Sequence, residues 1–428
     1  MKLVVGAVAF VLAAPLAAQT PEETAAAALE AAPVWDGHND VPWQLRGRRG
    51  NVLAEFDFAD TADEPDGDGG TEPMHTDFPR LAEGRVGAQF WSVYVPADLA
   101  PDEAAVATIE QIDVTKRLVA RYPDRLQLAL TASDVEQAMQ AGRIASLIGM
   151  EGGHSIAGSL GVLRQMYDLG ARYMTLTHSR NTPWADSATA APEHDGLTHF
   201  GSDVVREMQR IGMLVDLSHV SEATMMDALE VAEAPVIFSH SGAFAVTPHA
   251  RNVPDAVLRR LRDNGGIVMV VALPGYVSEA RQQWGAQREA ERKRLEVLFP
   301  GAPDQVTEGV DAWVAAHPEP KATIADMADH VDHVRDVAGI DHIDHVRRIA
   351  GIDHIGVGGD YDGMDTGPVG MEDVAGYPAL FAELARRGYS QADLERIASR
   401  NMMRVLEAAE AYAAAHRGDP PIEHPVGD

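Results

Sequence analysis

Short apolar runs rich in β-branched residues alternate along the chain with longer segments whose apolar residues recur at helical spacing. The runs that predict strands lie at 34–38, 88–95, 145–150, 172–177, 213–217, 235–238, 266–272 and 354–357. The intervening and final segments predict helices at 20–33, 102–121, 133–141, 157–169, 199–212, 221–232, 254–264, 373–387 and 390–415. Strands that alternate with helices in this way predict a parallel sheet covered by helices.

The number of predicted strands favours an α/β fold of the closed (β/α)₈ TIM-barrel type, with insertions after the first and the seventh strand. We expect the first insertion, 41–87, to be irregular and the second, 275–350, to be largely helical. An open doubly wound sheet is the alternative. No strand is followed by Gly-x-Gly-x-x-Gly or a Walker-type loop, which disfavours the nucleotide-binding versions of that sheet.

The amino terminus has the pattern of a secretory signal peptide: one lysine, the apolar run 3–12 and small residues up to Gln19. The run is too short to span a bilayer comfortably. We expect cleavage near Ala17 to Gln19, so that 1–19 is removed and 20–428 forms one barrel domain that includes the C-terminal helices. The mature chain is then expected to be periplasmic or secreted, with no membrane anchor.

Charge and composition restrict the partners and the chemistry. Lys and Arg number 35 against 65 Asp and Glu, a net charge of −30 that disfavours binding to nucleic acid or to anionic membranes. The 428 residues include no cysteine. Disulfides, thiolate ligands and a cysteine nucleophile are therefore excluded, and any metal must be held by His, Asp or Glu.

Potential metal ligands or acid–base groups stand at the carboxyl ends of six predicted strands, where barrel enzymes place their chemistry. They are His38 with Asp40, Glu151, His178, His219, His240 and Asp360. His38 and Asp40 are two residues apart, so both side chains leave the strand on the same side. Each residue alone also fits a hydrogen-bonded structural role; their recurrence at successive strand ends indicates one site.

Three histidines and two carboxylates of this set suit two zinc ions. His38 and Asp40 would hold one ion, His219 and His240 the other, and Glu151 is the carboxylate best placed to bridge them.

Water that bridges two such ions is acidified towards hydroxide near neutral pH and can attack a carbonyl group. His178 and Asp360 then remain for oxyanion stabilisation and proton transfer.

The order of seven motifs resembles the membrane dipeptidase (renal dipeptidase) family of zinc peptidases, within the amidohydrolase-type barrels. The motifs are Asp36-Gly-His-Asn-Asp40, Glu151-Gly-Gly-His-Ser155, Leu176-Thr-His178, Asp216-Leu-Ser-His-Val220, Phe238-Ser-His-Ser241, Arg251-Asn-Val-Pro-Asp255 and Gly358-Gly-Asp-Tyr-Asp-Gly363. They span nearly all of the expected mature chain. The chain departs from the family's animal members in lacking their disulfides and the C-terminal hydrophobic tail of their lipid anchor.

The resemblance implies the same ligand set and adds further roles. His178 would bind the scissile carbonyl oxygen, and Arg251 the free carboxylate of the substrate, a task for which a guanidinium is suited. Asp360 would carry a proton to the leaving amine, with Asp362 as the alternative. His154 would lie behind the metal ligands.

The function implied by the resemblance is a binuclear zinc dipeptidase with two Zn²⁺ per chain and a bridging hydroxide. Its substrates would be dipeptides with a free C-terminal carboxylate, Xaa-D-Xaa included, and a homodimer is expected by resemblance alone. One alternative is a metal-dependent amidohydrolase that acts on N-acyl amino acids, lactones or lactams with the same ligands. The other is a homologue that binds zinc but has lost catalysis.

A tandem repeat of 12 residues, 330–341 and 342–353, precedes the last predicted strand. Its histidines and aspartates allow a metal site, but its apolar positions recur at helical spacing. We expect an amphipathic helix and the turn into the last strand, duplicated once, with the histidines at the barrel end opposite to the site. A duplication that is not accommodated there would displace Asp360. The acidic stretch 60–70 is likewise expected to be a solvated loop rather than a calcium site.

Overall fold

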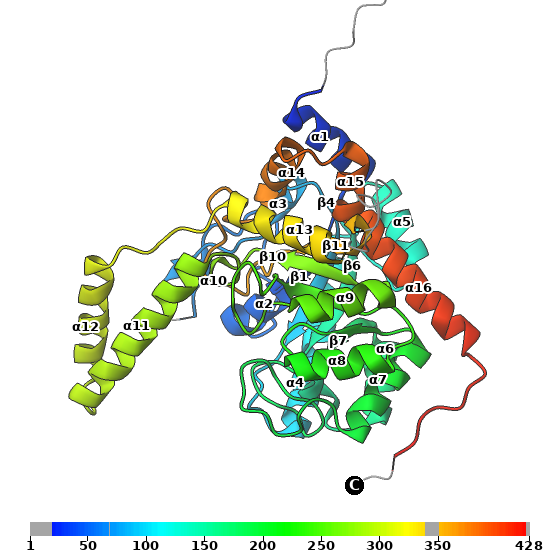
Figure 1. The fold of residues 1–428 in the computed structure, drawn as a ribbon, viewed down its shortest axis with the longest axis horizontal. Helices are drawn as coiled ribbons and strands as arrows, with labels where there is room; N and C mark the ends of the chain where they lie inside the picture. The colour runs from blue at the N-terminus through cyan, green and yellow to red at the C-terminus, as the bar shows by residue number, and fades with distance from the viewer. Residues whose placement is uncertain (1–18, 68, 339–350, 425–428) are drawn as a thin grey trace, which may run out of the picture.

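Eight parallel strands close a barrel in the computed structural model, which describes residues 19–67, 69–338 and 351–424 (Figure 1). In ring order they are β1 (Val34–Asn39), β4 (Val86–Tyr94), β6 (Ile144–Glu151), β7 (Ala171–Thr175), β8 (Leu214–Asp216), β9 (Ile237–Ser241), β10 (Ile267–Val271) and β11 (Ile355–Gly358), which pairs with β1. The predicted (β/α)₈ barrel is confirmed, and the open sheet is wrong. The predicted signal peptide, 1–19, lies outside the described residues except for Gln19.

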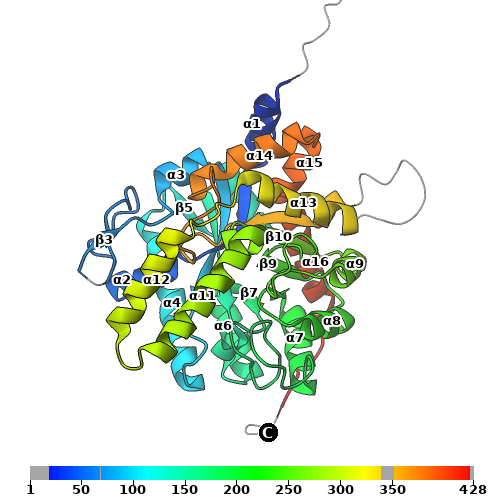
Figure 2. The ribbon, with the colours of Figure 1, turned by 60° about the vertical axis from the view of Figure 1, so that its left-hand side comes forward.

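Helices surround the barrel, as Figures 1 and 2 show from two directions. They are α1 (Pro21–Ala31), α4 (Pro101–Arg121), α5 (Ala132–Gln140), α6 (Leu160–Leu169), α7 (His199–Ile211), α8 (Glu222–Val231), α9 (Asp255–Asn264), α13 (Ile324–Ala338), α14 (Tyr377–Arg386), α15 (Gln391–Glu395) and α16 (Asn401–Ala415). Side-chain caps set several starts: Ser221 accepts the N–H of Thr224 before α8. α6 starts later than predicted because Ser159 caps it by accepting the N–H of Val162. Within the described ranges, no helix has both the length and the apolar composition to cross a bilayer.

Aromatic side chains fill the barrel beneath the carboxyl ends of the strands. The rings of Trp35 and Phe90 lie 5.8 Å apart, and those of Phe90 and Tyr173 4.9 Å apart. The Tyr173 ring has room because Gly149 faces it: a Cβ on Gly149 would lie 2.0 Å from Cζ of Tyr173. This packing directs the Tyr173 hydroxyl upwards, towards the strand ends.

The first insertion is more regular than predicted. It contains α2 (Val41–Arg49), the hairpin β2 (Glu64–Pro65) with β3 (Thr71–Glu72), and α3 (Phe78–Glu83). α2 starts at a proline-containing first turn, buries Leu45 and ends at Gly50, whose φ of 54° is left-handed. Its few apolar positions and its arginines gave no helical period in the sequence. The short strand β5 (Leu126–Leu128), which pairs with the start of β6, was also missed.

The second insertion is helical in its described part, as predicted. It contains α10 (Pro274–Val277), α11 (Glu279–Leu298) and α12 (Pro303–Ala316) before α13. α11 and α12 pack against each other around Leu295, Val306 and Val310 and extend away from the barrel (Figure 1).

The described part of the first copy of the tandem repeat, 330–338, forms the second half of α13, which confirms the helical prediction for these residues. Residues 339–341 lie outside the described residues. Most of the second copy, 342–350, lies outside the described residues. The predicted place of the histidines is wrong for His330, because its Nδ1 accepts the N–H of Ala243, just beyond the carboxyl end of β9. In a barrel the helices run antiparallel to the strands, so the first half of α13 lies beside the strand ends that carry the site.

Candidate metal centre

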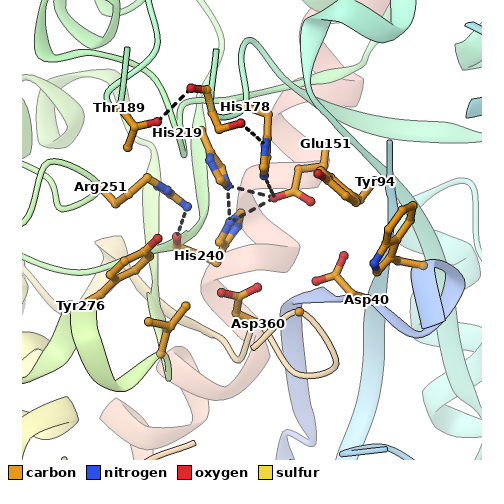
Figure 3. A pocket seen from close by; sticks show the side chains of 14 residues that line it. Asp40, Tyr94, Glu151, His178, Thr189, His219, His240, Arg251, Tyr276 and Asp360 are labelled. Atoms are coloured by element: carbon orange, nitrogen blue, oxygen red, sulfur yellow. Dashed lines mark hydrogen bonds and ion pairs between the residues drawn. The ribbon is translucent and has the colours of Figure 1, made fainter. Parts of the chain in front are cut away.

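The residues predicted from the strand ends converge on one pocket of about 320 Å³ at the carboxyl end of the barrel (Figure 3). Its polar lining consists chiefly of Asp40, Glu151, His178, His219, His240, Arg251 and Asp360. His38 lies fully buried below them. The tandem repeat has therefore not displaced Asp360 from the site.

Glu151 stands at the centre of this pocket and uses its two oxygens in two directions. Oε1 lies 2.9 Å from Nε2 of His219 and 3.4 Å from Nε2 of His240. Oε2 lies 3.5 Å from Nε2 of His38 and accepts a hydrogen bond from Ser92 Oγ at 3.2 Å. This is the arrangement required of a carboxylate that bridges two cations.

Potential ligand atoms form three overlapping groups, in each of which all atoms lie within 4.8 Å of one another. The groups are His38 with Asp40 and Glu151; Glu151 with His219 and His240; and His38 with His240 and Asp360. The first two are the ligand sets predicted for two ions. The donors fit zinc, because imidazole and carboxylate are its usual ligands besides thiolate. Nε2 of His38 is buried with no hydrogen-bond partner among the described residues, and a cation would satisfy it.

A chain of hydrogen bonds behind His240 determines which nitrogen of its ring carries the proton. Ser239 Oγ donates to Asp216 Oδ2 at 2.7 Å, so at 2.8 Å it must accept the proton of His240 Nδ1. Nε2 of His240 then presents a lone pair to the pocket, as a metal ligand requires. Asp216 is itself held by Thr175 Oγ1 and by the N–H groups of Ser218 and Ser239. Asp216 and Ser239 belong to two of the motifs in the sequence, but nothing in the sequence indicated that they support His240.

His38 has a comparable support. Its Nδ1 lies 2.9 Å from the Tyr173 hydroxyl, which the packing at Gly149 directs upwards. Asp36 accepts the N–H groups of His38 and Gly359 and so ties β1 to β11. Burial raises the pKa of Asp36 to about 6, although these N–H groups favour its ionised form.

The electrostatics of the pocket favour the ligand states of Glu151, His219 and His240. Burial disfavours the charge of His38, but Tyr173, Glu151 and Asp40 outweigh burial and hold its pKa well above the ordinary histidine value. Burial disfavours the charge of Glu151, but the surrounding histidines, led by His38 and His178, outweigh burial and hold its pKa well below the usual range. Burial holds the pKa values of His219 and His240 well below the ordinary histidine value, which favours the neutral, metal-binding imidazole.

The other wall of the pocket combines His178 with aromatic rings. His178 stacks on His219 at 4.2 Å and lies 4.8 Å from the ring of Tyr94, which itself packs edge-on against Trp43. Burial lowers the pKa of His178, so the neutral form is favoured. Nothing in the sequence singled out Trp43 or Tyr94, because each looks like an ordinary core residue next to its strand.

Arg251 is almost fully buried, at 1% exposure, beside the ring of Tyr276. Its Nη2 donates to the carbonyl oxygen of His240, whereas Nε and Nη1 have no partner in the described part of the chain. No carboxylate there pairs with this guanidinium. A buried cation of this kind is costly unless an anion joins it.

Asp360 and Asp362 leave their turn in different directions. Both have left-handed φ values, 62° and 65°. Asp360 faces the pocket, and burial raises its pKa to about 8. Asp362 faces His75, whose N–H it accepts at 2.8 Å, so the alternative proton carrier lies outside the site. His154, expected behind the ligands, donates from Nε2 to Val95 O at 3.0 Å and does not line the pocket.

A closed (β/α)₈ barrel whose strand ends gather histidines around a shared carboxylate defines a metal-dependent hydrolase of the barrel type. The family model of the membrane dipeptidases (peptidase family M19) matches residues 22–343 and 340–419, and the chain belongs to this family. The two matched segments meet at 340–343, inside the tandem repeat. The resemblance seen in the motifs is thus confirmed.

Similar proteins are named as dipeptidases. Dipeptidase tcpJ of Claviceps purpurea is 40% identical over 397 residues, which cover 90% of this chain and 79% of the relative. Dipeptidase 3 of Rattus norvegicus is 37% identical over 406 residues, 94% of this chain and 70% of the relative. The chain is accordingly a peptide hydrolase, a dipeptidase of the M19 metallopeptidases.

Solved structures support the fold. The probable dipeptidase PvdM from Pseudomonas aeruginosa superposes with a TM-score of 0.75 at 22% identity, over 92% of this chain and 99% of that one. A metallo peptidase from Rhodobacter sphaeroides, liganded with a phosphinate mimic of L-Ala-D-Ala, superposes with a TM-score of 0.69 at 24% identity. The superposition covers 88% of this chain and 99% of that one.

The support of His240 generates a prediction about metal affinity. Ser239→Ala removes the acceptor of the Nδ1 proton, and we expect zinc to bind about 10- to 100-fold more weakly. Competition with a chromogenic chelator measures this change. Ser202→Ala on α7, whose hydroxyl only donates to Thr198 O, is the control and should bind zinc like the wild type. Unchanged affinity in Ser239→Ala would exclude the support role.

Proposed function

We propose that the protein is a binuclear zinc dipeptidase that hydrolyses dipeptides with a free C-terminal carboxylate, Xaa-D-Xaa included. One observation carries the proposal: Glu151 is shared by two ligand groups in the same small pocket that contains the buried guanidinium of Arg251, which pairs with no carboxylate among the described residues. The ligand groups account for two metals, and the guanidinium accounts for the substrate's carboxylate.

The donor set supports zinc at both positions. His38 and Asp40 would hold one ion and His219 and His240 the other, with one oxygen of Glu151 directed to each. Bound zinc would supply an acidified water and polarise the scissile carbonyl group.

The position of Arg251 limits the length of the substrate. The guanidinium lies against the carbonyl oxygen of the ligand His240, so a carboxylate paired with it lies within one residue of the ligand cluster. A peptide with further residues on its C-terminal side would have to pass the wall that Arg251 and Tyr276 form. This geometry favours cleavage of the bond next to the C-terminal residue.

His178 and Asp360 have the protonation states that hydrolysis needs. Neutral His178 has an N–H available for the carbonyl oxygen at the mouth of the pocket. Asp360, with a pKa of about 8, retains a proton near neutrality that it would give to the leaving amine. The ligand of the Rhodobacter sphaeroides peptidase, a mimic of L-Ala-D-Ala, supports extending the substrates to D-residues.

Removal and return of zinc test the whole proposal. We expect purified mature protein to hydrolyse L-Ala-D-Ala and L-Ala-L-Ala, to lose both activities after chelation and to regain them with about two zinc ions per chain. N-acetyl-D-alanine is the comparison substrate. Turnover of the N-acyl compound without turnover of either dipeptide would instead favour the amidohydrolase. Two bound zinc ions without any turnover would favour a homologue that binds zinc but has lost catalysis.

Truncation of Arg251 tests the carboxylate site. We expect Arg251→Ala to raise KM for dipeptides by roughly 30-fold or more, because a buried charge pair is lost, and to change KM for C-terminally amidated dipeptides far less. Arg180→Ala is the control, because Arg180 is an exposed arginine of the loop after β7. Equal effects of Arg251→Ala on both substrates would remove Arg251 from carboxylate recognition.

We also propose that the chain is exported and that its leader is removed. The folded domain begins directly after the proposed cleavage site: Thr20 accepts the N–H of Glu23 and caps α1, and Glu23 accepts the N–H of Thr20 in return. N-terminal sequencing of the protein from the periplasm of a Gram-negative host should find a start close to Thr20. Protein that keeps Met1 and stays in the cytoplasm would refute export.

A further inference from the structure

We infer that His330, in the second insertion, is a positioning residue for Arg251 and thereby controls recognition of the substrate's carboxylate. This inference rests on the proposed function. His330 is the first residue of the tandem repeat, which the catalytic site itself does not use.

The ring of His330 joins two separate segments beside the pocket. It is fully buried on α13, and its Nδ1 accepts the N–H of Ala243 at 2.7 Å. The proton must therefore be on Nε2, which donates to Val277 O at 3.2 Å and lies 3.3 Å from Thr247 Oγ1. One side chain thus connects the loop after β9 to the end of α10.

These two segments are the ones that place the guanidinium of Arg251. The loop 242–253 carries Arg251 itself, and α10 carries Tyr276, whose ring centre lies 5.4 Å from the guanidinium carbon. Asn252 adds a second connection between the same segments: its Nδ2 donates to Thr247 O and to Tyr276 O, at 2.9 and 2.7 Å.

The packing leaves little freedom for the loop to move independently of His330. A Cβ on Gly242 would lie 2.7 Å from Nδ1 of His330 and 2.6 Å from Oδ1 of Asn252. The Gly242 N–H donates to the same Asn252 oxygen at 2.8 Å. His330, Asn252 and the loop are therefore one close-packed unit, and a gap at His330 would be transmitted to Arg251.

The same helix provides a matched control. His333 lies one turn further along the repeat, is partly exposed, and pairs through Nε2 with Asp255 Oδ1 at 2.8 Å, at the start of α9. Its removal takes a histidine from α13 without touching the loop 242–253. His342 and His345 of the second copy lie outside the described residues.

Steady-state kinetics of His330→Leu, His330→Asn and His333→Leu, with L-Ala-D-Ala and its C-terminal amide, test the inference. We expect His330→Leu to raise KM for the free carboxylate by about 10-fold or more, with a much smaller change in kcat, an unchanged KM for the amide and normal zinc content. His330→Asn should recover part of the loss, because its side-chain oxygen can accept the N–H of Ala243. His333→Leu should behave like the wild type.

Other outcomes separate this inference from the function on which it rests. Wild-type KM values in both His330 variants, or a joint loss of kcat and zinc without a change in the ratio of the two KM values, would leave His330 with a purely structural role. If His330→Leu does not fold, the KM ratio of His330→Asn, raised or unchanged, decides the question. Failure of the wild type to hydrolyse dipeptides, or normal discrimination in Arg251→Ala, would overturn the proposed function and this inference together.

Discussion

The buried carboxylate of Glu151 is the group around which the site is built. An isolated charge at this depth would cost several kcal/mol, so the barrel must surround it with compensating groups. Four histidines and the hydroxyl of Ser92 do so, and no lysine or arginine of the described residues forms an ion pair with Glu151. Imidazoles leave lone pairs where guanidinium groups would offer only N–H donors. The same compensation therefore leaves room for metal ions between Glu151 and its neighbours.

Two further carboxylates, Asp216 and Asp36, hold the strand ends that carry the histidines of the pocket. Asp216 accepts the N–H of Ser218 and, from the neighbouring strand β9, the N–H of Ser239. Asp36 accepts the N–H of His38 and, from the end of the neighbouring strand β11, the N–H of Gly359. Each thereby connects two strand ends at the level where ligands leave the backbone. These hydrogen bonds tie neighbouring strand ends together, so the side chains that would bind metal start from fixed positions. The ring of Tyr173 completes this layer under His38.

The sequence predicted the barrel and the four histidines that meet at Glu151, because both follow from one rule. Parallel strands end at one edge, so polar residues that follow apolar runs must converge there. What it could not predict depends on packing across the barrel. Trp43 and Tyr94 have ordinary core chemistry, and only the three-dimensional arrangement places them at the pocket. The helix α2 was missed because its burial is tertiary, with little period of its own.

The error about the tandem repeat has a more general cause. A helix that connects two barrel strands passes both ends of the barrel, so the distance of a residue from the next strand does not tell which end it reaches. His330 lies 25 residues before β11 in sequence, yet its ring touches the loop that carries Arg251. The duplicated unit ends next to β11, at the opposite end, where α13 has already passed the site. Asp360 lines the pocket although the chain carries the second copy, and His330 of the first copy holds the loop that carries Arg251.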